Sequence, residues 1–263
     1  MKRLRRPRSY GSLILLCVSL TAGAADVDTF DISQFEKKTF ELGGYAELRQ
    51  ERFDFNRGGA FYALGPYARA QRETLDRTRG TLQLVGKWRP GAGTFDFRTH
   101  SQVQHDQLDG DREHAIYEAA YSARPAPGVT LEAGKRALRW GKGYAWNPIA
   151  FLERPKDPNE PELAREGFVL ANGDFIFNPG SDLQTVAFTP VLLPVGEDVN
   201  SEFGLKGHLN PAAKLYLLYR DTDIDIAWQG KGSRPARFGF DFSRNITSNF
   251  EIHGELVGHV RSP

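Results

Sequence analysis

The chain has 263 residues, with 34 Lys and Arg against 33 Asp and Glu and a formal net charge of +1. Past its first residues it has no concentrated basic stretch, so it is not expected to bind nucleic acid. Its one cysteine, Cys17, lies in the N-terminal leader. The remaining chain therefore cannot form a disulfide scaffold or a thiolate metal site.

Residues 1–24 have the three parts of a secretory signal peptide. Five cations precede a short apolar run from Leu13 to Ala22, and Ala22-Gly23-Ala24 supplies the small residues of a cleavage site. The run is too short to span a membrane. We therefore expect residues 25–263 to be exported as one domain. Without the five cations of the leader, 29 Lys and Arg remain against 33 Asp and Glu, a net charge of −4.

Apolar and polar residues alternate through most of the exported chain. Glu251-Ile252-His253-Gly254-Glu255-Leu256 shows this most clearly, and a period of two predicts β-strands with one apolar and one polar face. Gly, Pro and Asn mark turns between the strands, and one such turn is expected at 210–213. Longer loops are expected at 56–79 and 221–235. The pattern predicts eleven strands, at 40–52, 80–88, 94–105, 114–123, 129–138, 168–177, 182–190, 201–209, 214–220, 236–243 and 249–259.

The predicted connections are longer after the odd-numbered strands than after the even-numbered ones. Short turns at one end and long loops at the other are typical of a bacterial outer-membrane barrel, whose strands need only about 9–11 residues. We therefore predict an all-β, antiparallel, up-and-down transmembrane β-barrel surrounded by outer-membrane lipid. Such barrels generally have an even number of strands, so an eleventh strand predicts the N-terminal portion of a longer barrel. A complete barrel of twelve short strands, one of them missed, is the alternative.

Charged residues recur on the polar faces of the predicted strands. If these faces line a pore, rings of charge would set its selectivity, and the mixed signs argue against a strongly single-sign filter. The alternation alone does not distinguish a barrel from a soluble sandwich. The candidate pore-lining residues are Arg49, Arg98, Glu118, Glu132, Arg136, Glu251 and Glu255.

The longest predicted connection, 139–167, is unlike a disordered tail because it holds two tryptophans, several prolines and balanced charges. Our interpretation is a loop folded into the barrel mouth that narrows the pore, since long ordered loops are usually functional. The alternative is a rigid surface loop packed on itself around Trp140 and Trp146. The candidate constriction residues are Arg139, Lys142, Glu153, Arg154, Lys156 and Asp157.

Part of this segment resembles a known group of proteins. The residues are Arg139-Trp140-Gly141-Lys142-Gly143-Tyr144 continuing to Asn147-Pro148, then Arg154-Pro155, then Glu162-Leu163-Ala164-Arg165-Glu166-Gly167. They resemble the first long loop region of uncharacterised Gram-negative outer-membrane porin-like proteins. The segment is also distantly similar to the alginate-export and substrate-specific porin type of barrel. The resemblance covers mainly residues 130–190 and implies a barrel of more strands than are present here. It assigns no chemistry to these positions.

The sequence predicts a porin-like channel in the outer membrane of a Gram-negative bacterium. It would pass small polar or charged solutes, or an exported polymer such as a polysaccharide, and a homo-oligomer is compatible with this prediction. The alternative is a secreted or periplasmic β-sandwich or barrel that binds carbohydrate, which would need no detergent. The histidines lack metal-site spacing and no Gly-x-Ser-x-Gly motif occurs. We therefore expect no enzyme activity, cofactor or metal.

Overall fold

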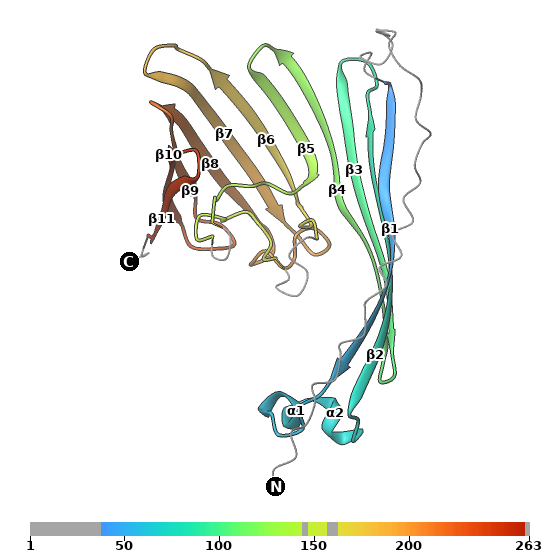
Figure 1. Cartoon of the computed structure of the whole chain (residues 1–263). Coiled ribbons are helices and arrows are strands. Elements are labelled where there is room, and N and C mark those ends of the chain that lie inside the picture. The colour runs from blue at the N-terminus through green and yellow to red at the C-terminus, as the bar shows by residue number, and fades with distance from the viewer. Residues whose placement is uncertain (1–37, 144–146, 157–162, 261–263) are drawn as a thin grey trace, which may run out of the picture. The chain divides into compact units, whose positions relative to one another are not determined.

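The computed structural model describes residues 38–143, 147–156 and 163–260, so the predicted signal peptide lies outside the described residues. Eleven strands form one sheet in which each strand pairs with the next in sequence (Figure 1). They are β1 (Phe40–Asp54), β2 (Thr74–Trp88), β3 (Gly93–Asp106), β4 (Gly110–Ala126), β5 (Val129–Arg136), β6 (Phe168–Phe177), β7 (Leu183–Val195), β8 (His208–Tyr219), β9 (Thr222–Gln229), β10 (Arg237–Thr247) and β11 (Phe250–His259). The predicted all-β, up-and-down antiparallel sheet is confirmed.

The described residues divide into two compact units. The smaller unit comprises 45–83 and 101–114, and the larger comprises 38–44, 84–100 and the described residues from 115 onward. The smaller unit holds the two short helices, α1 (Ala60–Leu64) and α2 (Pro66–Arg69). Within it, the rings of Phe55 and Tyr62 lie 6.0 Å apart, and Arg57 pairs with Glu73 at 2.9 Å. In the described part of the chain, neither helix has the length and apolarity to cross a membrane.

The strands of the larger unit align their apolar positions on one face. Direct partners across the sheet from β6 to β11 form one apolar row: Phe175, Phe188, Leu215, Ile226, Phe240 and Leu256. Because successive side chains point to opposite faces, the residues beside this row point the other way. There the corresponding row on β8 to β11 is Tyr216, Asp225, Asp241 and Glu255. The sheet thus has an apolar face and a polar face.

The predictions were wrong for residues 201–207, 210–213 and 222–229, whereas the predicted strand 214–220 lies within β8 apart from its last residue. The segment 201–207 forms turns rather than a strand, and the predicted turn at 210–213 lies inside β8. Asn210 and Pro211 suggested a turn, yet both fit the strand. The Asn210 amide is buried and donates to the Leu193 carbonyl at 3.1 Å. Proline has no backbone N–H, so Pro211 removes one hydrogen-bond donor from the strand. Its carbonyl still accepts the Gly230 N–H at 2.8 Å.

The predicted loop at 221–235 contains a complete strand, β9. It follows β8 through a two-residue turn in which Arg220 and Asp221 have φ values of 45° and 58°. Two successive positive φ angles are the geometry of the tightest hairpin turns, which usually hold Asn or Gly. Neither residue type is present here, and the weaker turn preference of Asp221 did not distinguish this position from the rest of the predicted loop.

The connections are sorted by length nearly as predicted. Longer ones follow β1, β5, β7 and β9, at 55–73, 137–167, 196–207 and 230–236. Short ones follow the even-numbered strands, at 89–92, 127–128, 178–182, 220–221 and 248–249. The prediction was wrong after β3, where the connection is only 107–109 because β3 and β4 extend further than their alternation indicated.

Candidate functional site

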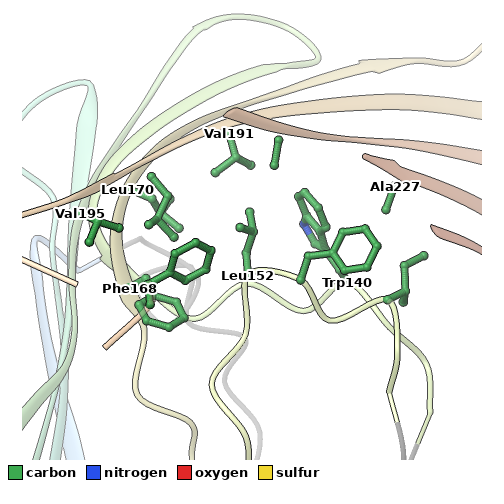
Figure 2. Close-up of a cluster of buried hydrophobic side chains, with 12 residues drawn as sticks. Trp140, Leu152, Phe168, Leu170, Val191, Val195 and Ala227 are labelled. Carbon is green, nitrogen blue, oxygen red and sulfur yellow. The ribbon is translucent and has the colours of Figure 1, made fainter. Parts of the chain in front are cut away.

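The described residues of the connection between β5 and β6, which are 137–143, 147–156 and 163–167, pack on the polar face of the larger unit. Figure 2 shows Trp140 and Leu152 from this connection pointing toward Leu170, Val191 and Ala227 on the strands. Trp140 thus packs on the sheet, whereas Trp146 lies outside the described residues. The buried cluster consists of Trp140, Ile149, Phe151 and Leu152, Phe203 from the next long connection, and Phe168, Leu170, Val191, Leu193, Val195, Ala212 and Ala227 from β6 to β9.

Small residues on the strands make room for the loop. Gly239 on β10 lies directly opposite Ala227 on β9. A Cβ atom added at Gly239 would lie 2.6 Å from Ile149 Cγ1 and 3.0 Å from Phe151 Cζ. Any larger residue would therefore displace these two side chains. The local sequence Phe238-Gly239-Phe240 puts the glycine on the polar face and its aromatic neighbours on the apolar face.

Three carboxylates on β9, β10 and β11 form what we call the acidic row: Asp225, Asp241 and Glu255. Asp241 is the direct partner of both others, an arrangement that like charges alone would destabilise. The loop supplies the compensating cation, because Lys142 Nζ lies 3.3 Å from Asp225 Oδ2 and 3.3 Å from Asp241 Oδ1. Lys214 on β8 adds a second, 3.4 Å from Asp225 Oδ1.

Glu255 binds the backbone of the loop. Its Oε1 accepts the N–H groups of Lys142 at 3.0 Å and Gly143 at 2.7 Å, and its Oε2 accepts that of Ile149 at 3.3 Å. These donors lie in irregular backbone, where a buried N–H without an acceptor would be costly. The acidic row therefore holds the loop both by charge and by hydrogen bonding.

Other loop charges stabilise the loop itself. Glu153 accepts the Trp140 N–H at 2.6 Å and pairs with Arg165. Burial, together with the positive charge of Arg139, lowers the pKa of the Arg165 guanidinium below its ordinary value. Arg154 lies 3.7 Å from Glu166, pairs with Glu202 and stacks 4.5 Å above the Phe168 ring. Of the remaining candidate constriction residues, Arg139 is exposed, Lys156 lines a cavity described below, and Asp157 lies outside the described residues.

Four candidate pore-lining residues meet on β3, β4 and β5. Arg136 lies 3.0 Å from Glu132 and 3.7 Å from Glu118, and Arg98 lies 3.4 Å from Glu118. Asp96, which was not a candidate, completes the group at 3.8 Å from Arg136. We call this group the arginine wall.

The other three candidates lie elsewhere. Arg49 is in the smaller unit and pairs with Glu47 at 2.9 Å, and Glu251 accepts the Ser243 hydroxyl at 2.8 Å. Glu255 belongs to the acidic row, whose two aspartates were not candidates. Asp225 was missed with its whole strand. Asp241 lies in the alternating segment 237–242, so its polar-face position could have been used to find it.

Two cavities border the first residues of the loop, 137–139. One, which we call the loop cavity, has a volume of about 340 Å³, and its charged lining is Arg98, Glu118, Arg139, Glu153, Lys156 and Arg165. The other, the strand cavity, has a volume of about 840 Å³ along β2 to β6, and its charged lining is Lys87, Arg89, Asp96, Arg124, Glu132, Arg136, Arg139 and Asp174. Ala137, Leu138 and Arg139 line both cavities.

The fold and the site define an all-β protein whose single up-and-down sheet carries a packed loop on its polar face. No protein-family model and no curated protein matches the chain. Among solved structures, a mutant of the Rhodobacter blastica porin is similar at 13% sequence identity, with 85% of each chain covered and a TM-score of 0.32.

Proposed function

We propose that this chain forms an outer-membrane β-barrel channel for small polar or charged solutes, narrowed by the loop 137–167. The observation that carries the proposal is the distribution of side chains over the two faces of the sheet. Charged groups lie on the face that holds the buried cluster and the cavities, whereas large apolar groups lie exposed on the other. A soluble protein normally arranges its faces the opposite way.

The apolar face suits hydrocarbon. Phe188, Phe238 and Leu256 are 45%, 52% and 71% exposed, and other large apolar side chains surround them on β5 to β11. Contact with lipid removes such a surface from water, and this stabilises the protein by about 25 cal/mol for each Å² of apolar surface that is covered. A contiguous apolar surface of this extent marks an interaction site. A lipid bilayer would cover it on every strand at once.

The polar face suits a narrowed pore. The arginine wall and the cavities of about 340 and 840 Å³ leave charged, hollow space beside the loop. The acidic row and the buried cluster keep the loop in place. Fixed charges beside a constriction are the usual origin of solute selectivity in pores.

Two leucines with similar exposure test the membrane assignment. Leu256 is on the apolar face of β11 and 71% exposed, and Leu205 is in the connection 196–207 and 67% exposed. In a barrel folded into lipid vesicles, we expect Leu256→Arg to lower the free energy of unfolding by about 2–4 kcal/mol if it lies near the bilayer midplane. Leu205→Arg should change it by about 0.5 kcal/mol or less.

Equal, small effects of both substitutions would contradict the membrane assignment. So would fractionation of the native chain without detergent, which would favour a secreted carbohydrate-binding barrel or sandwich. The channel assignment has its own test, conductance of the full chain in planar lipid bilayers. Folded protein that inserts without conducting would refute it.

A further inference from the structure

We propose that the loop cavity binds small anions bearing a carboxylate or phosphate group and makes the pore anion-selective. The inference rests on the proposed channel for its transport role. The cavity lies between the loop and the strands β3 and β4, in a single compact unit of the structure. Its described lining carries four cations and two carboxylates, so the question is what those two carboxylates already contact.

Both carboxylates are engaged by protein groups. Glu118 contacts Arg98 and Arg136 and also accepts the Ala137 N–H at 3.2 Å. Glu153 pairs with Arg165 and accepts the Trp140 N–H. A carboxylate surrounded in this way attracts little further positive charge. Arg139 is therefore a cation in excess of those that Glu118 and Glu153 contact.

Arg139 carries this excess. It is exposed, and among the described residues it takes part in no ion pair. Its positive charge contributes to the lowered pKa of Arg165, so the two guanidinium groups repel each other across the cavity. An anion between them would relieve that repulsion. Guanidinium groups bind carboxylate and phosphate through paired, charge-assisted hydrogen bonds.

The positive character continues on the other side of Arg139. In the strand cavity, Asp96 and Glu132 already contact Arg136, and Asp174 accepts the Thr189 hydroxyl at 2.6 Å. Arg124, an exposed residue, lines the same cavity. The described lining of this cavity has five cations against three carboxylates, so an anion would meet an excess of positive charge on both sides of the loop. The arginine wall itself holds two arginines and three carboxylates, so the positive character comes from the cations beside it, Arg139 and Arg124.

The test uses the full chain in planar bilayers separated by a KCl gradient. The reversal potential gives the permeability ratio of chloride to potassium. We expect the native channel to favour chloride and Arg139→Gln to lower the ratio about fivefold, the effect of ~1 kcal/mol from one water-screened charge at about 4 Å. Arg139→Glu should lower it further. Arg220→Gln is the matched control, because Arg220 pairs with Asp182 at a turn remote in sequence from the loop, and it should leave the ratio unchanged.

A channel that favours potassium, or one whose ratio Arg139→Gln does not alter, would overturn the anion site and leave the channel assignment standing. A second measurement needs no channel. Calorimetric titration of the detergent-solubilised protein with potassium phosphate should show saturable binding, weakened about fivefold by Arg139→Gln. Equal binding by both proteins, or none by the native protein, would also overturn the site. Saturable binding without conductance would instead refute the channel and keep the site.

Discussion

The polar face of the sheet has two regions that use charge differently. On β9 and β10, the side chains of Asp225 and Asp241 are 2% and 0% exposed beneath the loop. On the arginine wall, the carboxylate side chains of Glu132, Glu118 and Asp96 are 9%, 16% and 19% exposed beside the two cavities. Both regions arise from the same alternation of polar and apolar residues. The acidic row holds a segment of the chain, while the arginine wall stays accessible to solvent.

The difference shows that a charged residue on a polar strand face need not line a pore. Glu255 was a candidate for pore lining, yet both of its oxygens accept backbone N–H groups of the loop. Removing one partner of a buried charge pair typically costs about 3–5 kcal/mol, whereas an exposed pair contributes about 0–1 kcal/mol. Substitutions in the two regions should therefore have separable effects.

The largest effect is expected at Lys142. Lys142→Met removes the loop cation that lies 3.3 Å from both aspartates of the acidic row. Two adjacent buried carboxylates would then repel each other, with Lys214 left beside only Asp225. We expect the free energy of unfolding in urea to fall by about 3–5 kcal/mol. We also expect conductance to rise and fluctuate as the loop leaves the strands.

Lys231→Met is the control for this change, because Lys231 is exposed in the connection 230–236. Replacing the carboxylates as well, in the triple variant Lys142→Met with Asp225→Asn and Asp241→Asn, should recover part of the lost stability. Such recovery is the sign of coupled residues. If Lys142→Met behaves like Lys231→Met, the acidic row does not hold the loop and the contrast between the regions fails.

A smaller effect is expected at Gly239. In Gly239→Ala the new methyl group meets Ile149 and Phe151 at 2.6 and 3.0 Å, so the loop must shift. Overpacking of this kind typically costs about 1–3 kcal/mol. Gly258→Ala on the neighbouring strand is the matched control, since nothing lies within 4 Å of its added Cβ. Thermal unfolding of the two variants compares them directly, and equal midpoints would show that the loop does not need the space above Gly239.

The alternation in the sequence predicted most of the sheet. The sequence also placed the strand 168–177 at the bounds of β6, although its first four residues, Phe168-Val169-Leu170-Ala171, are all apolar and do not alternate. It failed at β8 and β9, where Pro211 lies inside a strand and Arg220 and Asp221 form a turn without Gly or Asn. Turn signals describe residue preferences, and tertiary pairing can override them.

The site was less predictable. The sequence indicated an ordered loop with functional charges, and it named Lys142 and Glu255. The sequence did not predict that these two residues are in contact, because they are 113 residues apart. A repeat pattern within one strand says nothing about which distant loop packs on it. The contact of Ile149 and Phe151 with Gly239 could not be predicted either, since it depends on which strands lie side by side. The sequence was therefore sufficient to identify candidate residues, whereas their interaction partners could be identified only from the register of the sheet.

The smallest effect on stability is expected at Arg136, in the arginine wall. Arg136→Gln removes contacts with Asp96, Glu118 and Glu132. Arg136 and Lys142 are similarly exposed, but the carboxylates that Arg136 contacts are 9–19% exposed, against 0–2% for those of Lys142. Because Arg98 also still contacts Glu118, we expect a loss of only about 1 kcal/mol in urea unfolding. The same change uncovers carboxylates in both cavities, so the permeability ratio should move toward potassium. A loss of stability as large as that of Lys142→Met would show that the arginine wall is also a structural element, and the distinction between an accessible and a loop-holding region would then be wrong.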